Sequence, residues 1–158
     1  MVYNELSDTG IEMVNTVRRL DVYEVFEKVV SAKSRKDKIK ILRENNIMPI
    51  RDVLQGTFDD RVQWNLPAGT PPYTPAAEGS PAPQTLLKQH LNFKYFVKGL
   101  RESEKLIPVK RERMFIDILE SIDSRDAEIL VNMINKKPPM SGITKKLVQE
   151  AYPDLLPE

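Results

Sequence analysis

The chain contains no cysteine among its 158 residues, and this absence excludes several kinds of site at once. Disulfide bonds, zinc–thiolate sites, iron–sulfur clusters and cysteine nucleophiles all require that residue. Histidine occurs once, at His90, so a metal site with two imidazole ligands is excluded as well. Because His90 falls on a predicted helix, we interpret it as a surface or half-buried side chain. The sequence therefore predicts no metal site and no cofactor.

Motifs that identify enzymes are also lacking. The six glycines form neither a GxGxxG pattern nor a Walker loop, and no GxSxG nucleophile elbow is present. The acidic pair Asp59–Asp60 has no EF-hand spacing around it, so we interpret it as a solvated turn. These absences predict a protein without enzymatic activity and without catalytic residues.

Neither an excess of one charge nor a long apolar run is present. Lysine and arginine number 24 against 23 acids, a net charge of +1, whereas proteins that coat nucleic acid usually carry a clear basic excess. No window reaches the roughly 20 apolar residues needed to cross a bilayer. The first residues lack the basic start and apolar core of a secretory signal. We expect a protein that is neither secreted nor membrane-bound, and that works in the cytoplasm.

Proline, by contrast, is concentrated in one place. Six of the twelve prolines fall within residues 66–83, together with Gly69 and Gly79. Proline lacks a backbone donor, so neither a helix nor a central strand can run through this stretch. The sequence predicts a long irregular connector here, of a kind that is usually functional or flexible.

Apolar residues on both sides of the connector recur with helical spacing, and no segment alternates as a strand does. Val22, Val25 and Phe26 begin one such stripe, and Asp21 with Glu24 resembles a capping box at its start. Gly56 is expected to end a helix that has Pro49 in its first turn. Further helices are predicted after Ser34, from Thr85 to about Lys98, at Pro108, after Asp123 or Ser124, and after Thr144.

These elements predict an all-α fold, a compact bundle of about seven mostly short helices. We expect a lead-in with a modest helix over residues 1–20, an N-terminal helical part over 21–65, the connector over 66–83 and a C-terminal helical part over 84–158. At 158 residues the chain is long enough to bury a core. The two helical parts are therefore expected to form one compact domain.

The connector supplies the main interaction hypothesis. Trp64 and Tyr73 place an aromatic ring at each end of a polyproline-prone run that includes a PxxP pattern from Pro72 to Pro75. An alternative, slightly favoured, is that both rings hold the connector against the protein's own helices, because such rings bury large areas. With the C-terminal tail added, the predicted protein-binding residues are Trp64, Leu66, Pro71, Pro72, Tyr73 and Tyr152.

Two basic clusters supply a second hypothesis, nucleic-acid binding. Acids interrupt both clusters, and both lie where an amphipathic helix needs charge on its solvated face, so we prefer solvated faces over phosphate contacts. Binding that weakens steeply as salt rises would favour phosphate contacts. The candidate residues are Arg35, Lys36, Lys38, Lys40, Lys110, Arg111 and Arg113.

Short motifs between Trp64 and Pro153 connect the chain to a known group of proteins, and the resemblance covers roughly Val22 to the C-terminus. They are Trp64-Asn-Leu-Pro67, Pro71-Pro72-Tyr73, Phe96-Val-Lys-Gly99, Arg113-Met-Phe115, Leu119-Glu120-Ser121, Asp126-Ala127, Lys136-Lys137, Gly142-Ile-Thr-Lys145 and Ala151-Tyr-Pro153. Together they resemble small uncharacterised proteins of large contractile-tailed bacteriophages, including those that infect cyanobacteria. The resemblance implies a viral origin and no assigned activity.

Taken with the connector, this resemblance leads us to expect a non-enzymatic phage accessory protein. It would bind another protein, either a host factor or a virion component, and would be found in the host cytoplasm or in the virion. The alternative is an accessory protein that binds nucleic acid through its basic helix faces.

Overall fold

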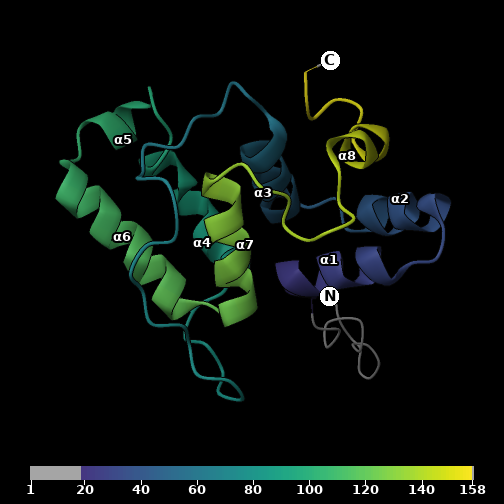
Figure 1. The fold of residues 1–158 in the computed structure, drawn as a ribbon, viewed down its shortest axis with the longest axis horizontal. Helices are drawn as coiled ribbons and strands as arrows, with labels where there is room; N and C mark the ends of the chain where they lie inside the picture. Colours follow the sequence, from purple (N-terminus) through teal and green to yellow (C-terminus); the bar gives the residue numbers. More distant parts are fainter. Residues whose placement is uncertain (1–18, 158) are drawn as a thin grey trace, which may run out of the picture.

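The computed structural model describes residues 19–157, and within them the chain forms helices and loops without a β-strand (Figure 1). The predicted all-α class is confirmed, whereas the helix expected within the first twenty residues lies outside the described range. None of the described helices has the length and apolar character needed to cross a bilayer. The elements are α1 (Val22–Ser31), α2 (Arg35–Glu44), α3 (Met48–Phe58), α4 (Leu86–Gln89), the 3-10 helix η2 (His90–Tyr95), α5 (Arg101–Glu104), α6 (Pro108–Ser121), α7 (Ser124–Ile134) and α8 (Lys145–Ala151).

Several side chains at the predicted helix starts form capping hydrogen bonds, whereas Thr85 forms none at the start of α4. The Ser34 hydroxyl accepts a hydrogen bond from the backbone of α2 at 3.1 Å, and the Thr144 hydroxyl accepts one from α8 at 3.2 Å. At α1, a Glu24 carboxylate oxygen accepts the Asp21 N–H at 2.9 Å. These bonds satisfy backbone groups that have no partner at a helix end. The helix starts are therefore determined by local chemistry.

The single helix predicted from Thr85 to about Lys98 is wrong. After the short α4 the chain tightens into η2, and an isolated antiparallel bridge then pairs Trp64 with Val97. Two backbone hydrogen bonds flank the bridge, from Asn65 N–H to the Phe96 carbonyl at 2.6 Å and from Lys98 N–H to residue 63 at 2.8 Å. A backbone in extended pairing cannot be helical at the same time, so this long-range contact prevents a helix from continuing to Lys98. The short α5 that follows was not predicted either.

Gly56 lies inside α3 and does not end it, as had been predicted. The helix continues to Phe58, and two core side chains pack directly against the glycine. A Cβ atom at residue 56 would lie 2.5 Å from Cζ2 of Trp64 and 2.9 Å from Sδ of Met133. The close approach of these two side chains, and not the end of a helix, therefore explains why a glycine occupies position 56.

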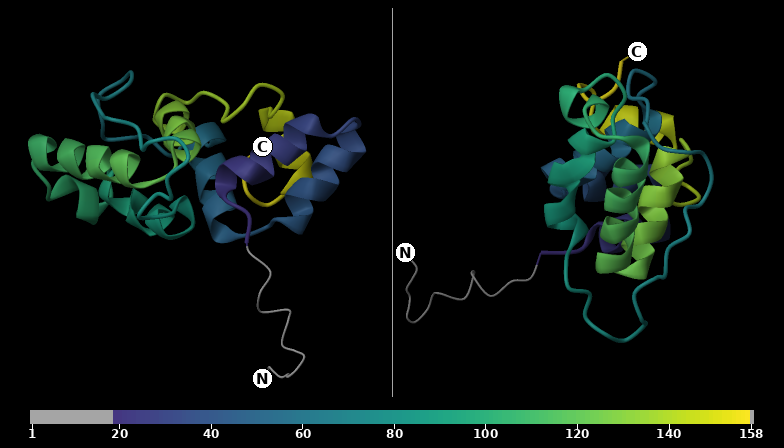
Figure 2. Two further views of the ribbon diagram at one scale, coloured as in Figure 1. Left: turned by 90° about the horizontal axis from the view of Figure 1, so that it is seen from below. Right: turned by 90° about the vertical axis from the view of Figure 1, so that its left-hand side faces the viewer.

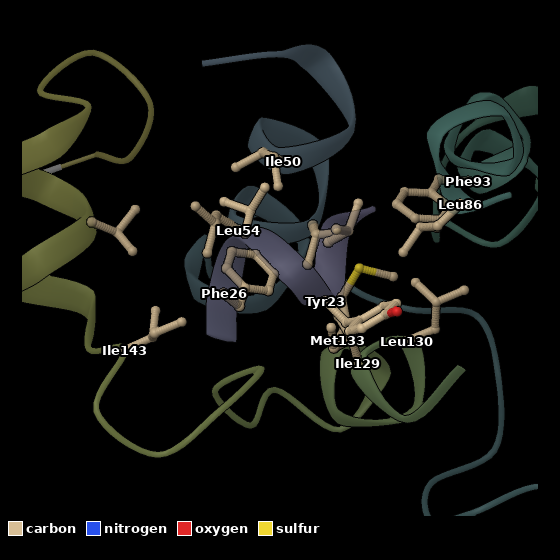
Figure 3. Close-up of a cluster of buried hydrophobic side chains, with 14 of the residues drawn as sticks. Tyr23, Phe26, Ile50, Leu54, Leu86, Phe93, Ile129, Leu130, Met133 and Ile143 are labelled. Carbon is tan, nitrogen blue, oxygen red and sulfur yellow. The ribbon is translucent and has the colours of Figure 1, made fainter. Parts of the chain in front are cut away.

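One apolar core takes side chains from both sides of the connector. Helix α7 packs against α1, α3 and α6. In Figure 3, Leu130 and Met133 of α7 lie among Phe26, Leu54 and Phe93, which come from α1, α3 and η2. The N-terminal and C-terminal helical parts therefore share this core.

The connector is irregular, as predicted, and is held at several points along α6 and α7. The Asn135 side chain both accepts the Gly69 N–H at 2.7 Å and donates to the Gly69 carbonyl at 3.0 Å. Farther along, Thr74 N–H donates to a Glu120 carboxylate oxygen at 2.8 Å, and residue 84 donates to the carbonyl of residue 121 at 2.9 Å. Between these last two bonds the connector projects beyond the helices (Figure 2).

Candidate functional site

Two residues predicted to bind a partner, Trp64 and Tyr152, are buried. Trp64 is 8% exposed, donates its indole N–H to the Gly56 carbonyl at 2.9 Å and meets the ring of Phe93 edge-on. Tyr152 is 2% exposed and donates its hydroxyl to the Leu42 carbonyl. Neither side chain is therefore an exposed ring: Tyr152 is enclosed, and only the 8% exposed part of Trp64 reaches the surface. Trp64 instead holds the chain leading into the connector against α3, which is the alternative that the sequence favoured.

The other predicted protein-binding residues lie on the connector itself. Leu66 and Tyr73 are half-buried and pack against the core, and Pro71 is half-buried as well. Pro72 is the exposed member of this set. The connector thus turns most of its large side chains toward the protein's own helices.

Two of the predicted nucleic-acid-binding residues already have backbone partners. Arg111 is 8% exposed, and its guanidinium donates to the carbonyls of Asn65, Ser103 and Leu106 at 2.7, 3.0 and 2.8 Å. The prediction of a phosphate contact by Arg111 is therefore wrong, because the side chain is buried and its Nε and Nη1 donors are used inside the protein. Lys38 is half-buried and donates to two carbonyls, of residues 29 and 30, at the end of α1.

The two basic clusters are not brought together. The one on α2 and the one on α6 lie at opposite ends of the molecule (Figures 1 and 2). Arg35 pairs with Glu150 of α8 at 2.9 Å. Lys36 and Lys40 are exposed and line an open groove of 910 Å³ between α2 and α8, whereas Arg113 is exposed on α6. We call this open groove between α2 and α8 the α2–α8 groove.

A more apolar depression, the α3–η2 groove, has a volume of 290 Å³. Leu91 is 68% exposed and Leu100 is 41% exposed, and both line it. Buried Trp64 and Phe93 and half-buried Val97 contribute apolar surface to the same groove. The full lining is Asp52, Gln55, Gly56, Val62, Trp64, His90, Leu91, Phe93, Lys94, Val97 and Leu100.

The repeat of the 3-10 helix explains how η2 shapes this groove. With three residues per turn, side chains three apart fall on the same face. His90 and Phe93 are accordingly buried at 8% and 7% exposure, while Leu91 and Lys94 are exposed. An α-helical repeat would not have separated these two pairs, so a prediction based on α-helical spacing missed the groove.

One polar pair lies in the α3–η2 groove. His90 Nδ1 is 2.6 Å from an Asp52 carboxylate oxygen, a contact that orients the imidazole. No sequence pattern links these residues, which are 38 positions apart. The groove lining includes no serine, threonine or cysteine that the imidazole could activate as a nucleophile. Within residues 19–157, no group of three or more acidic or histidine side chains is placed to hold a metal ion. The groove offers an apolar surface with one fixed polar pair.

Comparison with known proteins identifies a family for this chain. Residues 25–138 match a family described as a family of unknown function (DUF6433). This range begins within α1, ends after α7 and includes every residue of the α3–η2 groove. No curated protein matches the chain.

Proposed function

We propose that this chain, which belongs to the family of unknown function DUF6433, is a non-enzymatic protein that acts by binding another protein through the α3–η2 groove. The observation that supports the proposal is the exposure of Leu91 and Leu100 beside an apolar, aromatic depression. Grouped apolar side chains of this kind are typical of interaction surfaces. The resemblance to phage proteins supports a bacteriophage setting, with a host factor or a virion component as the partner.

The size and chemistry of the groove indicate what the partner presents. Its 290 Å³ lies at the lower limit of small-molecule pockets, about 300–1,000 Å³, and suits one or two inserted side chains. A large apolar side chain would pack between the two leucines and against Trp64 and Phe93. Exposed Lys94 in the lining favours a carboxylate next to that side chain. Such a central, desolvated anchor is typical of residues that dominate binding energy.

Partner capture from the cells in which the protein is naturally made tests this proposal. Tagged wild-type protein is compared with the double variant Leu91→Asp, Leu100→Asp, which places two charges in the groove. The matched control is Val109→Asp, because Val109 is 75% exposed and does not line the groove. We expect the double variant alone to lose a partner found by mass spectrometry, with unchanged melting temperatures. Equal capture by all three proteins would contradict the proposal.

The α2–α8 groove supports a second candidate function, nucleic-acid binding, because Lys36 and Lys40 are exposed in its lining. If both contact phosphates, a rise in salt from 50 to 200 mM should weaken binding to DNA about tenfold. Lys36→Glu with Lys40→Glu should abolish that binding, whereas Lys110→Glu with Arg113→Glu, at the other end of the molecule, should not. Absence of salt-dependent binding to DNA and RNA would eliminate this candidate.

A further inference from the structure

A second cavity, the connector cavity, lies between the connector and helices α6 and α7. It has a volume of 150 Å³ and shares no lining residue with the α3–η2 groove. Most of its lining side chains are apolar, and Thr70 and Glu112 are the polar ones. The lining consists of Leu66, Pro67, Ala68, Thr70, Pro71, Pro72, Glu112, Phe115, Ile116 and Ile134.

The connector side of this cavity is held in place. Asn135 grips Gly69 through two hydrogen bonds of 2.7 and 3.0 Å, and Glu120 accepts the Thr74 N–H at 2.8 Å. These contacts lie within and just beyond the stretch that lines the cavity. The prolines on either side of Gly69 have a fixed φ and little conformational freedom to lose. Because this wall is rigid, we expect the cavity to persist without a ligand.

Glu112 is the charged group in the lining, and it has no partner within the described part of the chain. No hydrogen bond or ion pair joins it to another residue of the range 19–157. Nor does α6 supply a neutralising cation, because the positions three and four residues away are Pro108, Val109, Phe115 and Ile116. The cavity therefore combines mostly apolar lining side chains with a half-exposed carboxyl group that has no ion-pair partner in the range 19–157.

We propose that the connector cavity binds a small organic cation, namely a primary amine on a compact apolar body. An apolar cavity of about 150 Å³ accommodates a group the size of benzene, which sets the size of that body. The ammonium group would donate a charge-assisted hydrogen bond to Glu112, and the Thr70 hydroxyl can accept another of its N–H groups. This site is independent of the protein-binding function proposed above.

Titration of the full chain with benzylamine, followed by ¹H–¹⁵N NMR, tests the proposal. Benzyl alcohol is the neutral ligand of matched size. We expect saturable shifts from benzylamine at the backbone amides around Gly69 and Glu112, and binding of benzyl alcohol about tenfold weaker, as expected for loss of a charged hydrogen bond. Equal affinity for the two ligands, shifts elsewhere in the protein, or no saturable shift would each overturn the proposal.

A pair of variants on α6 isolates the carboxylate. Glu112→Gln should weaken benzylamine binding about tenfold and leave benzyl alcohol binding unchanged. Asp117→Asn removes the same charge from an exposed position of the same helix that does not line the cavity, and should leave both affinities unchanged. An equal effect of the two substitutions on benzylamine binding would overturn the assignment of Glu112.

Discussion

The indole N–H of Trp64 donates to the carbonyl of Gly56 at 2.9 Å, and the ring lies so close that the glycine has no space for a side chain. Lys136 Nζ donates to the same carbonyl at 2.8 Å and to the Asp59 carbonyl at 3.0 Å. Carbonyls in the last turn of a helix lack intrahelical donors. The sole tryptophan and one lysine of the chain therefore satisfy the end of α3, and join it to the chain on both sides of the connector.

Gly56→Ala should destabilise the protein. Helix propensity alone would favour alanine by about 1 kcal/mol. The new Cβ would, however, lie 2.5 Å from a ring carbon of Trp64, and overpacking of a core typically costs about 1–3 kcal/mol. We expect the free energy of unfolding, measured by urea denaturation, to fall by an amount in that range. Met48→Ala, at an exposed position of α3, serves as the control, and stabilisation by Gly56→Ala would refute the packing described here.

Trp64→Ala should lower the melting temperature strongly. The side chain is 8% exposed, and large-to-small substitution of a buried tryptophan costs about 3–5 kcal/mol. The Gly56 carbonyl would keep Lys136 as a donor, so the loss is expected to come mainly from the cavity left behind. Circular dichroism melts of this variant and of Leu100→Ala, which removes a 41% exposed side chain, provide the comparison. Similar melting temperatures for the two variants would show that Trp64 does not anchor the fold.

Asp126 should make stability depend on pH. This carboxyl is 1% exposed and accepts the Tyr23 N–H at 2.9 Å. Burial, with a contribution from the nearby carboxylates of Asp21 and Asp123, raises its pKa to about 7. The folded protein therefore keeps a proton that the unfolded chain releases above about pH 4, so the stability that Asp126 contributes falls as pH rises from about 4 to 7.

Asp126→Asn isolates this effect, because the amide oxygen can still accept the Tyr23 N–H but does not titrate. The free energy of unfolding of the variant minus that of the wild type should rise by on the order of 2 kcal/mol from pH 5 to pH 8. Urea denaturation of both proteins at the two pH values measures the difference, in which all other titrating groups cancel. A difference that is the same at pH 5 and pH 8 would mean that Asp126 is ionised in the folded protein.

Asn135→Ala should loosen the connector without unfolding the protein. The substitution removes both hydrogen bonds to Gly69 at a partly exposed position, where the two together are worth about 1–2 kcal/mol. We expect faster hydrogen exchange at the amides of residues 68–70 and only a small drop in global stability. Lys137→Ala, an exposed neighbour, should change neither. Unaltered exchange at Gly69 would show that the two hydrogen bonds do not hold the connector.

Most helix starts could be predicted because their causes lie within a few residues. Ser34 and Thr144 cap the helices that follow them, and prolines occupy the first turns of α3 and α6. The prediction of a helix from Thr85 to about Lys98 was wrong because the cause of its end is not local. Its continuation is prevented by backbone pairing with residues 63–65, far away in sequence, and short-range patterns carry no trace of such a contact.

The candidate sites were less predictable than the fold. Residue type predicted Trp64, Tyr152 and Arg111 as site residues, yet they are buried, whereas Leu91 and Leu100, which were not predicted, are exposed. No spacing in the sequence distinguishes a buried arginine that donates to three carbonyls from an exposed one.

The helical class, most of the helix starts and the irregular connector were determined by the sequence itself, because side-chain capping, apolar periodicity and the missing donor of proline act locally. Only the tertiary structure decided that η2 replaces a longer helix, that Gly56 lies under a tryptophan ring, and that Glu112 lines the connector cavity without an ion-pair partner among the described residues. Each of these depends on segments that meet only when the chain is folded, so its energy arises from packing and burial that no single segment possesses alone.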